Sequence, residues 1–172
     1  AVVRRRIQVI HAGKAAANQF PRLQLRRDRA VNLLRIGTQE LCRRHEVIPV
    51  CGEIFGGLPT PRLPSECREG GVFASDGGDV TDAFRRGAEE VVRLARLTGV
   101  QAAILKERSP SCGSGEIYDG TFTGTVVEGW GVTAELLRRE GIPVLGESRM
   151  GELLTEGEAC LVKITRDPAK KL

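Results

Sequence analysis

The sequence lacks a long hydrophobic run: no apolar stretch approaches the ~20 residues that a transmembrane helix needs. The apolar stretch from Ile7 to Ile10 is also too short for the hydrophobic region of a signal peptide. We therefore expect a cytoplasmic protein that makes no membrane contact. With 172 residues, of which 41% are hydrophobic, the chain has the size and composition of one ordinary soluble domain with a core.

Aromatic residues are scarce as well, and the chain's one Trp and one Tyr both lie outside its most basic part. Residues 1–36 carry nine Lys and Arg against one acidic residue, a charge of +8, whereas the whole chain carries +4. Such a basic arm can bind nucleic acid through phosphate contacts. Because no interleaving of aromatic residues supports a stacking surface, we expect a solvated leader and keep a nucleic-acid-associated protein as an alternative.

Cysteines are few, odd in number and irregularly spaced: the chain has five. This pattern argues against a disulfide framework and favours reduced thiols, some of them ligands or nucleophiles. The glycine pairs at 56–57 and 113/115 lack the Gly-Lys-Ser/Thr of a phosphate-binding P-loop, so that class of site is excluded.

Alternating strand and helix patterns predict an α/β fold. Four short apolar segments are predicted as strands: residues 7–10, 47–50, 100–105 and 142–145. Three segments are predicted as helices: residues 38–44, 79–97 and 132–140. The alternation indicates a mostly parallel sheet with flanking helices, in a Rossmann-like three-layer sandwich.

The same patterns predict how the chain is divided. We expect an atypical basic segment over residues 1–36, one α/β domain over residues 37–160, and a C-terminal tail over residues 161–172. Residues 52–78 are predicted as a long Gly- and Pro-rich loop with one strand around Val72 and Phe73. A loop of that length in a compact domain is usually functional.

Two of the predicted strands lead into thiols. Cys51 follows the strand 47–50, and Cys112 lies in a polar, glycine-rich turn after the strand 100–105. Ligands of open α/β folds bind at the carboxyl ends of the strands. We therefore expect Cys51 and Cys112 to lie close together at one site, although they are far apart in the sequence.

The segment from residue 40 to residue 147 resembles a bacterial family catalogued as DUF523, the YbbK-like family. The stretches that carry the resemblance are VIPVCGEIFGGLPTPR, DVTDAFRRGAEE, AAILKERSPSCGSGEIYDGTFTG and GVTAELLRREGIPVLGE. Some members of this family are thiouracil desulfidases, in which three cysteines hold a [4Fe–4S] cluster and its fourth iron is open to take sulfur from the substrate.

The resemblance implies roles for residues of this chain. Cys51 and Cys112 match two of the three cluster cysteines, and Ser109 matches a residue of the catalytic neighbourhood. The acid of that neighbourhood matches either Glu53 or Glu107, and the sequence leaves both open.

The chain departs from the family at its start. Family members begin with a strand that ends in Cys-Leu-x-Gly, whereas the strand 7–10 is followed here by His11-Ala12-Gly13. The third cluster ligand is therefore missing from its usual place. His11 or Cys67 would have to replace it, because two cysteines alone anchor a [4Fe–4S] cluster poorly.

These observations predict an iron–sulfur desulfidase that removes sulfur from a small thiolated heterocycle such as a thiopyrimidine. Soft iron–sulfide sites prefer sulfur ligands, so the thiocarbonyl sulfur would bind at the cluster. Glu53 or Glu107 would handle protons and Ser109 would orient the substrate. The alternative is a degenerate, cluster-less family member that binds a small molecule.

Overall fold

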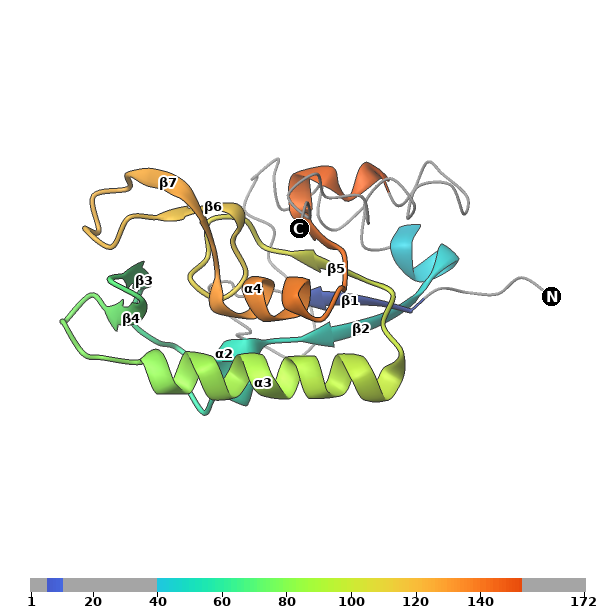
Figure 1. The fold of residues 1–172 in the computed structure, drawn as a ribbon, viewed down its shortest axis with the longest axis horizontal. Coiled ribbons are helices and arrows are strands. Elements are labelled where there is room, and N and C mark those ends of the chain that lie inside the picture. Colours follow the sequence, from blue (N-terminus) through green and yellow to red (C-terminus); the bar gives the residue numbers. More distant parts are fainter. Residues whose placement is uncertain (1–5, 11–39, 153–172) are drawn as a thin grey trace, which may run out of the picture.

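The computed structural model of the chain describes residues 6–10 and 40–152, and Figure 1 shows their arrangement. Residues 40–44 are helical. The further elements, in chain order, are β1 (Arg6–Ile10), β2 (Glu46–Val50), α2 (Gly52–Phe55), β3 (Ser65–Arg68), β4 (Gly71–Ala74), α3 (Thr81–Thr98), β5 (Ala102–Leu105), β6 (Ser114–Tyr118), β7 (Val126–Trp130), α4 (Val132–Arg139), β8 (Val144–Gly146) and the 3₁₀ turn η1 (Glu147–Arg149).

A four-stranded sheet with the order β2-β1-β5-β8 forms the centre of the molecule, and all of its strand pairs are parallel. Ile10 at the end of β1 pairs with Val50 on one side and with Leu105 on the other. The carboxyl ends of β2, β1 and β5 therefore meet at one edge of the sheet. This arrangement confirms the predicted parallel sheet and places the segments after Val50 and Leu105 side by side.

The long helix α3 forms because apolar residues recur at helical spacing along one face. Phe84, Ala88, Val91 and Ala95 are buried, and Gly99 ends the helix in the left-handed conformation at φ 64°. The helix begins at Thr81 and not at the predicted Asp79, because the Asp79 side chain accepts a hydrogen bond from the Thr81 amide at 2.9 Å.

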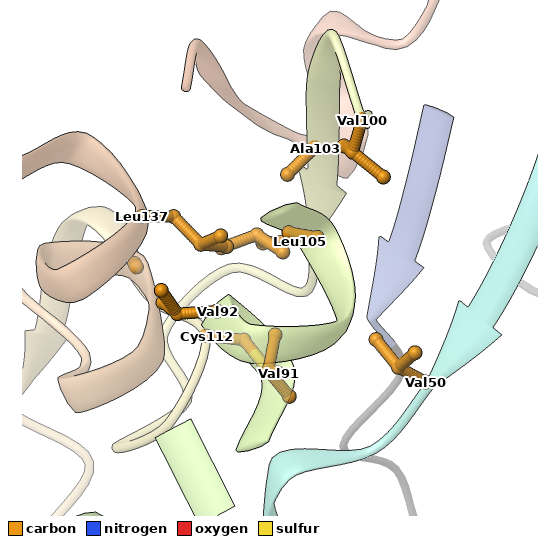
Figure 2. Packing of buried hydrophobic residues seen from close by; sticks show 10 residues of the cluster. Val50, Val91, Val92, Val100, Ala103, Leu105, Cys112 and Leu137 are labelled. Atoms are coloured by element: carbon orange, nitrogen blue, oxygen red, sulfur yellow. The ribbon is translucent and has the colours of Figure 1, made fainter. Parts of the chain in front are cut away.

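The core lies on both faces of β5, whose side chains alternate as in any strand. Ala103 and Leu105 pack against α3 and α4, in the cluster shown in Figure 2. Ile104 packs on the opposite face, with Leu41 and Leu145. Burial of a leucine of this kind contributes about 1.5–3 kcal/mol to folding.

Two antiparallel hairpins, β3–β4 and β6–β7, complete the described fold. The predicted strand around Val72 and Phe73 is thus one arm of a hairpin whose other arm was expected to be loop. The carboxylate of buried Glu66 joins the two hairpins, because it accepts hydrogen bonds from the amides of Gly120 and Phe122 at 3.0 and 2.9 Å.

The predicted Rossmann-like three-layer sandwich is not confirmed. α3 and α4 cover one face of the sheet, whereas the other face is covered, within the described residues, by short segments around Leu41 and Met150. The boundaries expected at residues 36 and 160 lie outside the described residues. No helix within residues 6–10 and 40–152 is long and apolar enough to cross a bilayer.

Candidate functional site

Cys51 sits at the junction of β2 and α2. It follows buried Val50 and occupies the N-cap position of α2, with extended backbone angles of φ −139° and ψ 109°. The short helix is pressed against α3, since a Cβ atom built on Gly87 would lie 1.8 Å from the carbonyl oxygen of Gly52. Backbone contact between two glycines thereby fixes where Cys51 leaves the sheet.

Cys112 lies in a tight loop between β5 and β6. The side-chain oxygen of Ser109 accepts hydrogen bonds from the amides of Ser111 and Cys112, each at 3.2 Å. The carbonyls of Pro110 and Ser111 in turn accept bonds from the first amides of α4, at 2.9 and 2.8 Å. The loop is therefore anchored at the start of α4, and Cys112 is buried in the core cluster together with Val91 and Val92 of α3 (Figure 2).

Glycine also lets the two thiol-bearing segments meet. A Cβ atom on Gly52 would lie 2.9 Å from the hydroxyl oxygen of Thr133 and 3.1 Å from that of Ser111. These two hydroxyls are buried and hydrogen-bonded to each other at 2.9 Å. The Cys51 segment, the Cys112 loop and α4 thus converge on Gly52.

Several of the predicted residues act on the pKa of the Cys112 thiol. Burial raises the pKa of the fully buried Cys112 thiol to about 12. A hydrogen bond from Ser111 lowers this pKa, the charges of Glu53 and Cys51 raise it, and a bond from Ser109 lowers it. Glu53 and Cys51 therefore lie within electrostatic range of the Cys112 sulfur, which is protonated at neutral pH.

The two candidate acids have different partners in the structure. Glu53 is 12% exposed and is paired with the guanidinium of Arg62 beside Cys51. Glu107 lies instead at the carboxyl end of β8, next to Gly146, where it accepts bonds from the amide of Ser148 at 3.2 Å and from the Ser148 hydroxyl.

Two residues of the site were not predicted from the sequence. Arg62 reaches back across eleven positions to place a guanidinium nitrogen 3.7 Å from the sulfur of Cys51. Thr133 was predicted only as part of the helix 132–140, yet its hydroxyl lies buried against that of Ser111. The sequence feature that could have indicated Arg62 is its position: it is a cationic residue in the Gly- and Pro-rich segment that follows the strand-end thiol Cys51.

Of the two candidates for a third ligand, the structure describes only Cys67. Cys67, on β3, donates its thiol hydrogen bond to the carbonyl of Pro110 at 3.6 Å, and burial, aided by the charge of Glu66, raises its pKa to about 11. His11 lies outside the described residues. Within residues 6–10 and 40–152, no group of three His, Cys, Asp or Glu side chains is arranged to hold a metal ion.

Comparisons with known proteins agree on one group of relatives. The family model of 2-thiouracil desulfurase matches residues 23–149. The uncharacterized protein YbbK of Bacillus subtilis (strain 168) is 37% identical over 126 residues, which cover 67% of this chain and 83% of YbbK. A solved structure of the [4Fe–4S]-dependent thiouracil desulfidase TudS matches with a TM-score of 0.65 and 46% identity, over 67% of this chain and 77% of that one.

Proposed function

The chain belongs to the 2-thiouracil desulfurase family, and from this premise we propose that it removes sulfur from a small thiolated heterocycle such as a thiopyrimidine, using a [4Fe–4S] cluster. The similarity to a [4Fe–4S]-dependent thiouracil desulfidase supports the proposal. The single structural observation that carries it is the convergence of Cys51, Glu53 and Cys112 at the carboxyl edge of a parallel sheet.

The described side chains fit two of the positions that a cluster needs. Cys51 and Cys112 would hold it, because thiolates are the protein ligands of [4Fe–4S] clusters. The buried Cys112 keeps its proton as long as no cation lies beside it, and a bound metal inverts this preference. The third ligand remains a prediction, either His11 or Cys67. His11 follows β1 in the sequence, and the carboxyl end of β1 lies directly beside that of β2, which leads into Cys51.

The overall reaction exchanges sulfur for oxygen at one carbon. When bound, the cluster would supply an open iron position that accepts the thiocarbonyl sulfur. Water adds its oxygen to that carbon, the carbon–sulfur bond breaks and sulfur leaves as sulfide, with no net transfer of electrons. We assign Glu53 to take the proton from the attacking water, because its carboxylate lies beside Cys51.

Ser109 and Ser111 would support the same chemistry from the other loop. Their hydroxyls lower the pKa of the Cys112 thiol, and so favour the thiolate that a metal requires. Ser109 is 6% exposed, and its side-chain oxygen also accepts hydrogen bonds from two backbone amides, which fix its position. We assign it the additional role of orienting the substrate.

One observation favours the degenerate alternative. Because the described residues bring Cys51 and Cys112 together with no third ligand arranged beside them, a chain that keeps the fold without a cluster would show the same geometry. Such a protein would bind a thiolated heterocycle without converting it.

The experiment that separates the two is anaerobic reconstitution with iron and sulfide, followed by absorbance spectroscopy and iron analysis. The proposal expects a brown protein with about four irons per chain, which releases sulfide and uracil from thiouracil. Cys42→Ser is the matched control, because Cys42 is exposed on the helical segment 40–44. A colourless, iron-free protein that still binds thiouracil would establish the alternative.

A further inference from the structure

The guanidinium group of Arg62 has a partner at each of its three nitrogens, which is more than a simple ion pair provides. Its Nε bonds the carboxylate of Glu53, its Nη1 bonds the carbonyl of Pro59 at 2.9 Å and the hydroxyl of Thr60 at 3.1 Å, and its Nη2 points to the sulfur of Cys51 at 3.7 Å. All three guanidinium nitrogens are thus engaged, and the side chain is only 18% exposed. Its orientation toward Cys51 is therefore fixed by the loop that precedes it.

We infer that Arg62 is a positioning residue of the desulfidase site, which holds the Glu53 carboxylate in place and donates a charged hydrogen bond to the Cys51 sulfur. The inference rests on the proposed function and extends it to a residue outside the ligand set. Arginine suits this role because its planar fork bonds a carboxylate and a second acceptor at once, and because it stays charged at every physiological pH.

The position of Arg62 predicts two effects on a bound cluster. A cation and an N–H donor at a ligating sulfur stabilise the more negative, reduced form, so Arg62 raises the reduction potential. A fixed Glu53 keeps the proton acceptor aligned with the attacking water, so Arg62 supports turnover more than substrate binding. Partners that orient ligands in this way typically contribute about 10- to 100-fold in activity.

The matched control is Arg86. Its guanidinium bonds the carbonyl of Gly56 at 3.4 Å, so that it contacts the same loop region from α3 without touching Cys51 or Glu53. Arg62→Met removes the fork and the charge, Arg62→Lys keeps the charge alone, and Arg86→Met removes one loop contact. Each protein is reconstituted anaerobically as a full chain, and iron content, reduction potential, kcat and KM are measured.

The inference expects Arg62→Met to keep its iron, to shift to a lower potential and to lose about 10- to 100-fold in kcat with little change in KM. Arg62→Lys should recover part of the potential but little of the kcat, and Arg86→Met should match the native chain in both. A potential and kcat of Arg62→Met equal to those of Arg86→Met would overturn the inference and leave the proposed function intact.

A measurement on the cluster-free protein keeps the inference testable if the native chain binds no iron, a result that would refute the proposed function alone. Equilibrium unfolding of the native chain, Arg62→Met, Cys51→Ala and the double variant gives the coupling free energy between the two side chains. If the contact is present, the loss in unfolding free energy of the double variant should be smaller than the sum of the losses of the two single variants. Additive effects would show that Arg62 does not act on Cys51 and would overturn the inference.

Discussion

Gly87 of α3 lies against the backbone of Gly52 so closely that a single methyl group could not fit between them: a Cβ atom on Gly87 would lie 1.8 Å from the Gly52 carbonyl oxygen. This contact locates α2, and α2 in turn locates Cys51 and Glu53 at its first turn. The site is thus built on backbone packing between two helices.

The first prediction concerns this contact. Gly87→Ala should destabilise the cluster-free protein by about 1–3 kcal/mol, because overpacking outweighs the ~1 kcal/mol that alanine gains over glycine in a helix. Chemical denaturation measures the effect. Gly151→Ala is the control, since a Cβ atom there meets no neighbour within 4 Å and residue 151 is also helical. Equal stability of the two variants would show that α2 can move away from α3.

The second prediction concerns pH. The pKa of Cys112 is about 12 in the folded protein against 9.0 for an ordinary thiol, so the folded state binds its proton more tightly than the unfolded state does. The contribution of Cys112 to the free energy of unfolding is fully present below pH 9. It is lost as the pH rises toward 12, at up to about 1.4 kcal/mol per pH unit.

Denaturation of the cluster-free protein at several alkaline pH values tests this dependence. Cys112→Ala should flatten the slope, whatever its effect on absolute stability. Cys67→Ala should flatten the slope over a narrower range, which ends near pH 11, because the pKa of Cys67 is raised only to about 11. A slope that is the same with and without Cys112 would contradict the burial of this thiol.

The third prediction concerns the two thiol ligands. Cys51→Ser and Cys112→Ser should each lower the iron content of the reconstituted protein severalfold while the far-ultraviolet circular dichroism is retained, since a hydroxyl replaces a soft thiolate at nearly the same size. Cys42→Ser should keep its iron. Full iron content in Cys112→Ser would remove Cys112 from the ligand set.

The fourth prediction concerns the missing third ligand. His11→Cys restores a thiol where the family carries its first cysteine, so if the native chain reconstitutes with fewer than about four irons, this substitution should raise its iron content. His11→Ala and Cys67→Ala show which residue the native chain uses, because only the residue in use loses iron on substitution. If an iron-poor native chain gains no iron from His11→Cys, its low iron content has a cause other than the identity of one ligand.

The sequence was sufficient for the parallel sheet and for the convergence of Cys51 with Cys112. Both follow from short apolar strands that each lead into a thiol, because the carboxyl ends of parallel strands share an edge. The β6–β7 hairpin was missed because Ser114, Gly115 and Glu116 lack the alternation of apolar and polar residues that marks a half-buried strand.

The parts of the site that were missed depend on tertiary contacts. Glu53 lies three residues beyond the end of one strand and Glu107 two residues beyond the end of another, and only the folded chain shows that Arg62 binds Glu53 and Ser148 binds Glu107. Arg62 reaches Cys51 because the Gly- and Pro-rich loop folds back on itself. The path of such a loop cannot be predicted from hydrophobic periodicity, since the loop has none. Glycines 52 and 87 look like ordinary helix residues until their neighbours are known.

The convergence of Cys51 and Cys112 has a consequence for the lifetime of the protein. A cluster bound to both would close a chain loop of about 60 residues and would restrict the unfolded state as a cross-link does, by about 4 kcal/mol on the chain-entropy estimate. Oxygen that destroys the cluster would therefore open this cross-link together with the catalytic centre. Oxidative inactivation and susceptibility to proteolysis would then be one event, and the damaged chains would be those most readily removed.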